Sequence, residues 1–161
     1  KVNTIQDATN SNTAISVDSS GRVTTPTRPH AMVVINLTAT GGYDAVANDA
    51  VIPFAGIVRE TGSNYDTTNY RYVCPVAGLY LVTCNVIIDS AANLDIAVRL
   101  SGSDIHRFFE DDTRQIGFTT TIEASASQYI DFQQGSGGSR NINKAGTDAS
   151  RYTAASFTLI G

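Results

Sequence analysis

Few residues of this chain have the types and spacing that enzyme chemistry needs. The chain has two histidines, and His106 follows Ser103 by three residues, among several carboxylates. Serine, histidine and aspartate together suggest a hydrolytic triad, but such a site also needs a positioned oxyanion hole. The sequence contains no Gly-x-Ser-x-Gly turn that would present a nucleophile. A strand histidine beside carboxylates is more often a surface residue. We therefore expect no catalytic residue and no enzyme activity.

Asp111 and Asp112 are the residues best suited to a metal ion. They lie in a run from Glu110 to Arg114 that we predict to be a charged loop. Carboxylate oxygens suit calcium, but no EF-hand spacing is present, and a calcium site needs several converging oxygens. An Asp-Asp pair is more often a solvated turn. We expect no cofactor, and calcium at Asp111 and Asp112 is the alternative that stays open.

A long polar loop over residues 134–150 is the candidate recognition element. Its opening glycine-rich run lacks the Gly-Lys-Ser/Thr ending of a phosphate-binding loop. Long loops on a rigid β scaffold frequently carry binding function, and amide and charged groups suit hydrogen bonding to sugar hydroxyls. The alternative is a floppy loop with no binding role. The residues that we expect to bind a receptor are Arg140, Asn141, Asn143, Lys144 and Asp148.

Cys74 and Cys84 are the two cysteines of the chain. Two cysteines are too few for a disulfide scaffold. Both lie on the inward register of neighbouring predicted strands, so a single bridge is geometrically conceivable. The alternative, that both are small buried apolar residues, is favoured because free cysteine is commonly found in protein cores. Both interpretations stay open at this stage.

The composition is that of a β-protein with few charges. Of the 161 residues, 42% are hydrophobic and 16% charged, against about 25% charged in average soluble domains. The formal net charge of −4 and the isoelectric point near 4.9 argue against a nucleic-acid partner. No apolar run approaches the roughly 20 residues that span a bilayer, so we expect no membrane insertion.

Short alternating segments predict the fold class. Apolar and polar residues alternate with period two in many short runs, with turn residues between them and no helical stripe. Eight or more strands at this spacing predict an all-β sandwich or barrel. The expected strands include Met32 to Leu37, Val51 to Arg59, Tyr70 to Cys74, Leu79 to Ile88, Leu94 to Leu100, Ile105 to Phe109, Ile116 to Ile122, Gln128 to Phe132 and Tyr152 to Ile160.

Residues 1–31 differ from the rest and predict a separate stalk segment. They contain no aromatic residue, and a turn at Gly21 joins two short predicted strands. A hairpin of this size is marginal alone, but it becomes stable if copies from several chains share an apolar axis. A disordered polar leader is the alternative. We predict an oligomerisation stalk over 1–31 and a head over 32–161, and the alternating apolar residues that favour the stalk are Ile15, Val17 and Val23.

An aromatic ladder in the head resembles the signature of the complement 1q globular head, a relative of the tumour-necrosis-factor jelly roll. The matching positions are Phe54, Tyr65, Tyr72 and the Gly-x-Tyr step from Gly78 to Tyr80. The chain departs from the family where Glu60 replaces Asn or Asp and where Val82 and Cys84 replace aromatic residues. The resemblance spans residues 32–161 and implies a jelly-roll β-sandwich.

The resemblance also implies a homotrimer about a three-fold axis, in which head-to-tail contacts close a ring. Aromatic residues of the C-terminal half are candidates for the subunit interface. Some of them must instead line the core of the single subunit, and the sequence does not separate the two groups. The candidates are Tyr129, Phe132, Tyr152 and Phe157.

The leader from Asn12 to Pro26 resembles segments that precede the heads of bacteriophage tail fibres and other virion fibres. Complement-type proteins of animals usually have a collagen-like Gly-X-Y stalk at this place, and this chain has none. We therefore expect a virion protein whose trimeric head attaches to a host-surface glycan or protein and contacts other virion proteins. The alternatives are a secreted complement-type recognition protein or lectin, and a purely structural capsid-decoration protein.

Overall fold

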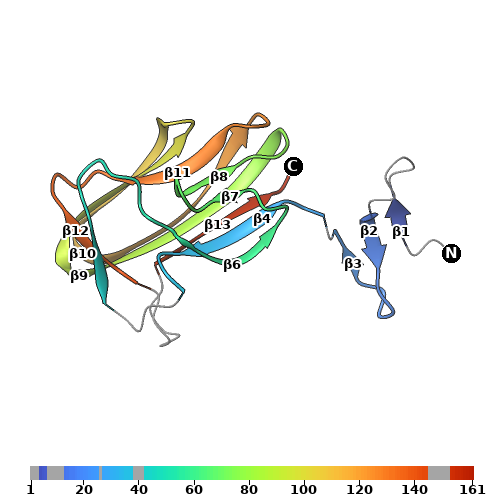
Figure 1. Ribbon diagram of the computed structural model, residues 1–161, viewed down its shortest axis with the longest axis horizontal. Coiled ribbons are helices and arrows are strands. Elements are labelled where there is room, and N and C mark those ends of the chain that lie inside the picture. The colour runs from blue at the N-terminus through green and yellow to red at the C-terminus, as the bar shows by residue number, and fades with distance from the viewer. Residues whose placement is uncertain (1–3, 7–12, 26, 38–41, 145–152) are drawn as a thin grey trace.

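The computed structural model describes residues 4–6, 13–25, 27–37, 42–144 and 153–161, and all regular structure within them is β-strand. One sheet contains three strands and the other contains ten (Figure 1). The strands are β1 Thr4–Gln6, β2 Thr13–Val17, β3 Val23–Thr24, β4 His30–Val34, β5 Tyr43–Val46, β6 Gly56–Thr61, β7 Tyr65–Asp66, β8 Arg71–Val73, β9 Gly78–Leu100, β10 Ser103–Ala124, β11 Tyr129–Gln134, β12 Arg140–Asn143 and β13 Ala154–Leu159.

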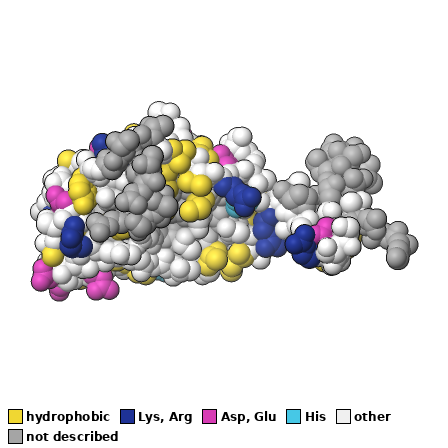
Figure 2. Space-filling view, turned by 90° about the horizontal axis from the view of Figure 1, so that it is seen from below, with side chains coloured by type: hydrophobic (Ala, Val, Ile, Leu, Met, Phe, Trp, Pro, Cys, Tyr) yellow, Lys and Arg dark blue, Asp and Glu magenta, His cyan; other side chains and the backbone are white. Residues whose placement is uncertain are grey.

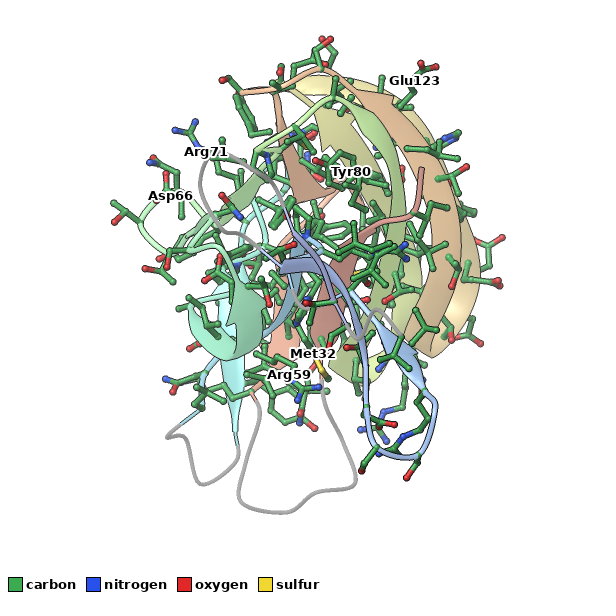
Figure 3. All side chains as sticks on the ribbon, turned by 90° about the vertical axis from the view of Figure 1, so that its right-hand side faces the viewer. Met32, Arg59, Asp66, Arg71, Tyr80 and Glu123 are labelled. Atoms are coloured by element: carbon green, nitrogen blue, oxygen red, sulfur yellow. The ribbon has the colours of Figure 1, made fainter. Side chains whose placement is uncertain are left out.

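A long hairpin of β9 and β10 links the two layers of the head. The first half of β9 pairs with β13, its second half pairs with β11, and β10 follows β9 along nearly its whole length. One layer therefore has the order β6-β4-β13-β9-β10, and the other has the order β7-β8-β11-β9-β10. The two layers close around one core, which confirms the predicted all-β sandwich (Figure 3).

The alternating sequence of β9 explains why it forms one wall of the core. Tyr80, Val82, Cys84, Val86 and Ile88 are all buried, whereas the residues between them are partly exposed. Successive side chains of a strand point to opposite faces, so this pattern covers the core on one side and meets solvent on the other.

Aromatic rings fill the centre of the sandwich. Tyr72 stacks on Phe157 with ring centroids 4.9 Å apart, and Phe132 lies 5.6 Å from both Phe54 and Phe157. These four side chains are almost completely buried. Each contributes roughly 1.5–3 kcal/mol through removal of apolar surface from water, so these four rings stabilise the core of the single subunit.

The charged run from Glu110 to Arg114 is not a loop, which corrects the prediction. It belongs to β10, where the register shifts between Glu110 and Thr113 and again between Thr113 and Gln115. The predicted breaks between Ile88 and Leu94 and between Phe109 and Ile116 are likewise absent, because β9 and β10 are continuous there. An edge strand tolerates such charges because its bulged residues face solvent.

One strand boundary and two strands differ from the prediction. The strand expected from Val51 begins at Gly56, and Val51 makes only an isolated bridge to Gln133. The polar segment 134–150 contains β12, which pairs with β5, a strand that begins at Tyr43 and that the sequence did not indicate. Asparagine in β12 and aspartate in β5 have low strand propensity, so pairing in the folded chain overrides the local preference here.

Strands β1, β2 and β3 form a small antiparallel sheet that stands apart from the head (Figure 1). It lies at the end of the head where the C-terminus is found, and residues 25–29 connect it to β4. The strands of the head begin at His30, two residues before the predicted boundary at 32.

Candidate functional site

Arg140, the first residue predicted to bind a receptor, is engaged with the backbone of its own chain. Its guanidinium donates hydrogen bonds to the carbonyl oxygens of Asn93, Ser136 and Ser139, each at 3.0 Å. This side chain therefore holds the glycine-rich turn against β9. These hydrogen bonds tie the segment before β12 to β9, whereas residues 145–150 of the predicted loop lie outside the described residues.

The other predicted receptor-binding residues are engaged in a similar way. Asn141 donates to Asp89 at 2.8 Å, which holds the pKa of that carboxyl below its usual range. Lys144 forms an ion pair with Asp44 at 2.7 Å, and Asn143 is buried. Asp148 lies outside the described residues. The described members of this set belong to β12 and the residue after it, and Arg140, Asn141 and Lys144 contact other segments of the head.

The structure separates the four aromatic candidates for a subunit interface. Phe132 and Phe157 lie in the core, whereas Tyr129 is half-buried on the outer face, with the Arg71 guanidinium 4.5 Å from its ring centroid. Asp66 forms an ion pair with Arg71, with Nε and Oδ2 3.2 Å apart, and Figure 3 labels both residues. Tyr152 lies outside the described residues. Within a single subunit, only Tyr129 of the described three can reach a neighbour.

Asp111 and Asp112 occupy the bulge of β10 and are exposed. The described residues contain no cluster of three or more histidine, cysteine or acidic side chains that could hold a metal ion. Figure 2 shows acidic side chains gathered at the end of the head away from the β1–β3 sheet. Calcium at Asp111 and Asp112 stays a prediction, and it would need ligands from further copies of the chain.

His106 and Ser103 lie near the start of β10, and both are exposed. The His106 ring lies beside Phe108, with centroids 6.4 Å apart. In the described part of the chain, no hydrogen bond joins His106 to Ser103 or to a carboxylate. A hollow of about 310 Å³ near β6 is lined by Asn36, Leu37, Ala55, Gly56, Ile57 and Thr67, none of which is ionisable.

Both cysteines are buried and free, which selects the second interpretation of the sequence. Burial raises the pKa of the Cys74 thiol to about 11 and raises that of Cys84 as well. Buried thiols of this kind are inert, since the thiolate is the reactive form.

The outer face of the layer β6-β4-β13-β9-β10 is nearly free of charge. Its exposed and half-buried side chains are small and polar, or aliphatic, and the Thr83 and Ser156 hydroxyls bond to each other at 2.6 Å. Among the described residues, charges on this face are confined to its margins, at Arg59, Asp89 and Glu123. Figure 3 shows Glu123 at the rim and Arg59 beside Met32 at the other side. The residues of the face include His30, Met32, Leu79, Leu81, Thr83, Asn85, Ile87, Gln115, Thr119, Thr121, Ser156 and Thr158, with His30 directly opposite Thr158.

The outer face of the other layer is built from ion pairs. Arg99 forms a two-point contact with Asp131, with Nε–Oδ1 and Nη2–Oδ2 distances of 2.6 and 3.0 Å. This pair is largely buried, and Asp131 raises the pKa of the Arg99 guanidinium. Arg107 is more exposed and contacts both Asp95 and Asp104. The two faces of the sandwich thus differ in kind, one neutral and one ionic.

Comparison with known proteins bears on the fold. No protein-family model matches the chain, and none of the curated proteins matches its sequence. Three solved structures, each covering 83% of this chain, are similar. They are the globular domain of zebrafish complement 1qA (TM-score 0.60, 13% identity, 98% of that chain), Eiger TNF from S. frugiperda (0.62, 13%, 93%) and murine APRIL (0.63, 10%, 99%).

The fold is a C1q/TNF-type jelly roll. At these identities the likeness concerns the fold, which is the fold that the aromatic ladder implied. In the described residues, no helix is long and apolar enough to cross a membrane.

The ladder residues have structural roles in this jelly roll. A Cβ on Gly78 would overlap the carbonyl oxygen of Gly161 and the side chain of Leu159, so only glycine allows the C-terminus to pack there. The Tyr80 hydroxyl donates to the Val76 carbonyl at 2.7 Å. Glu60, where the chain departs from the family pattern, accepts a hydrogen bond from the Tyr65 backbone amide at 2.6 Å. The longer side chain thereby supports the turn before β7.

The hydroxyls of Tyr65 and Tyr72 are buried, and neither has a hydrogen-bond partner among the residues that the structure describes. Burial raises the pKa of both phenols. An unpaired buried hydroxyl costs about 1–3 kcal/mol, so the apolar ring contacts outweigh this penalty in the folded head.

Proposed function

We propose that this chain is a non-enzymatic, homotrimeric recognition head on a short β stalk, and that it attaches a virion fibre to a host surface. The jelly-roll fold supports a recognition role. The observation that carries the trimer is the neutral outer face of the layer β6-β4-β13-β9-β10. Burying a face without charges avoids the large desolvation penalty of unpaired ions, so self-association costs least there.

The stalk supports the same proposal. Ile5 pairs with Ile15 and Val17 pairs with Val23, so the four apolar side chains share one face of the β1–β3 sheet. Ile5, Val17 and Val23 are 56%, 37% and 67% exposed, and the head does not cover them (Figure 1). A small sheet with an open apolar face is marginal alone. Three copies that turn these faces inward would bury them around one axis.

Light scattering tests the trimer. At micromolar concentration the wild-type protein is expected to have three times the chain mass of 17.1 kDa. A stable monomer would remove the proposal.

Cysteine substitution tests the stalk in the 161-residue chain. A Val17→Cys variant is expected to form interchain disulfides under mild oxidation, since its side chains meet at the axis. Ser16→Cys, on the opposite face of the same strand, serves as the control and stays monomeric on a non-reducing gel. The native thiols do not interfere, because both are buried. Equal cross-linking of the two variants would contradict the inward orientation.

A secreted complement-type recognition protein is the second candidate, because the fold likeness to the zebrafish complement 1qA domain fits it equally well. Binding to intact cells separates the two. Specific binding to one bacterial host strain favours a virion fibre, and binding to damaged or opsonised eukaryotic cells favours the secreted protein. Binding to neither would favour a structural role on a particle.

A further inference from the structure

The first half of β10 carries two exposed apolar side chains that lie outside the core of the described head. Ile105 is 45% exposed and Phe109 is 56% exposed. Four residues of strand place them about 13 Å apart. The Arg107 guanidinium lies between them along the strand and is held by Asp95 at 2.8 Å and by Asp104 at 2.9 Å. Two apolar groups thus stand on either side of a fixed arginine.

The backbone beside these side chains is also open. In the described residues β10 pairs with β9 alone, so its second edge has unpaired amide and carbonyl groups. Figure 3 shows β10 as the outermost strand of the sandwich on its side of the molecule. An edge strand with exposed apolar side chains is a template for the addition of a further strand. From Ser103 to Glu110, this edge offers both backbone hydrogen bonds and apolar contacts.

Charge decides which partner this edge accepts. Between Ser103 and Arg114 the strand carries four carboxylates against two guanidinium groups. Arg107 is paired with Asp104 of this strand as well as with Asp95 of β9, which leaves three carboxylates of the strand against Arg114. A second copy of the same edge would bring equal negative charge and be repelled. The neutral face proposed for the trimer joins the other half of β10, so it does not need this segment. The complementary partner is therefore a basic one from outside the trimer.

We propose that the β10 edge from Ser103 to Arg114 binds an extended segment of another protein, in which apolar residues are flanked by lysine or arginine. The segment adds a strand beside β10, its apolar side chains cover Ile105 and Phe109, and its cations lie near Asp104, Glu110, Asp111 and Asp112. This deepens the proposed function by naming the chemistry of the partner, and it rests on that function only for the partner's origin on a host.

Peptide binding to the full-length protein tests the proposal. The probe is a short fluorescent peptide in which valine and lysine alternate, and the matched probe has glutamine at every lysine position. Fluorescence anisotropy is expected to show at least about tenfold tighter binding of the lysine peptide, and this preference is expected to shrink as salt is added. Equal binding of the two peptides, or no binding, overturns the proposal.

Matched variants locate the site. Phe109→Ser and, separately, Ile105→Ser are each expected to weaken binding of the lysine peptide about tenfold or more, since exposed apolar anchors dominate such contacts. Val58→Ser is the control, because Val58 is similarly exposed at 48% but lies on β6. Unchanged binding in both β10 variants overturns the site.

Light scattering on the same samples separates this surface from the trimer interface. The two β10 variants are expected to keep the wild-type mass, and a fall in mass would mean that another copy covers Phe109, which overturns the proposal. A monomeric wild type that still binds the lysine peptide at Phe109 would remove the trimer and leave this inference standing.

Discussion

The two halves of β10 have the same strand partner and the same open edge, yet they differ in chemistry. Residues 103–114 include six charged side chains and the exposed Phe109, whereas residues 115–124 include one charge, Glu123, among threonines and small residues. The first half lies in the ionic layer and the second half lies in the neutral layer. A single strand therefore offers two kinds of surface, one suited to a charged partner and one suited to closure by identical copies.

The largest expected effect comes from placing a charge in the neutral face. Leu81 lies directly opposite Thr121 of β10 and next to Thr158 of β13. A Leu81→Arg substitution is expected to convert the trimer to monomers, because three unpaired guanidinium groups would have to lose water at the interface. Light scattering measures the mass.

Ser103→Arg provides the control for this experiment, since it adds the same charge to the exposed start of the ionic half. It is expected to leave the mass unchanged. If Ser103→Arg dissociates the protein and Leu81→Arg does not, the roles of the two halves are reversed.

The next effect concerns the ion pairs behind the ionic half. An Asp131→Asn change leaves Arg99 largely buried without its counter-charge, and breaking a buried pair on one side costs about 3–5 kcal/mol. Arg107→Gln breaks a far more exposed pair, for which at most about 1 kcal/mol is expected. Urea unfolding measures both free energies. Equal losses would mean that burial does not distinguish the two pairs.

The sequence predicted the parts of the fold in which local pattern and tertiary packing agree. The alternation that begins at Tyr80 placed the core face of β9 correctly, because period two in a strand leaves little freedom once one face is buried. The aromatic ladder predicted the jelly roll through a family resemblance, and two of its members, Phe54 and Tyr72, lie in the core. The sequence did not separate Phe132 from Tyr129, and the structure does, because the two residues are an odd number of positions apart on β11 and face opposite ways.

The candidate site was harder to predict, because its determinants are contacts between distant segments. Arg140 is of a residue type that often binds ligands. In the structure, however, its guanidinium donates to a backbone carbonyl 47 positions away in the chain. The acidic composition around Asp111 suggested a loop. In the structure these residues form a bulge within the edge strand β10. The exposure of Phe109 depends on which strand lies at the edge of the sheet. The local sequence pattern does not predict the order of the strands in a sheet.

A third experiment examines the interior behind the neutral half, where Cys84 lies opposite Phe118. The folded protein is expected to leave both thiols unreacted with a thiol reagent at pH 8, and unfolding in urea is expected to expose two. Burial raises the pKa of Cys74 from 9.0 to about 11. The unfolded chain therefore releases its proton first, so stability is expected to fall as the pH rises from about 9 through 11.

Cys74→Ala is the matched variant for the alkaline loss. It removes this ionisable group while filling most of the small buried volume, so its stability should depend less on pH between 9 and 11. Rapid reaction of a thiol in the folded wild type would contradict the burial of the cysteines. An unchanged alkaline slope in the variant would assign the loss to other buried acids, such as Tyr65 and Tyr72, whose pKa values burial also raises.

The smallest expected effect lies at the junction of the two halves, where Asp111 and Asp112 bulge from β10. Two carboxylates of one chain supply too few oxygens for calcium, so a site there requires the tips of several copies to meet. Millimolar calcium is then expected to raise the Tm of the trimer by about 2 °C, as weak binding at a few sites would. The double variant Asp111→Asn, Asp112→Asn should lose this rise, and Glu123→Gln, a change of an acidic residue at the other end of β10, should keep it.

Because assembly would complete the site, the monomeric Leu81→Arg variant should also lose the calcium response. A Tm rise that persists in that monomer would place the ion within a single subunit and separate calcium binding from the trimer.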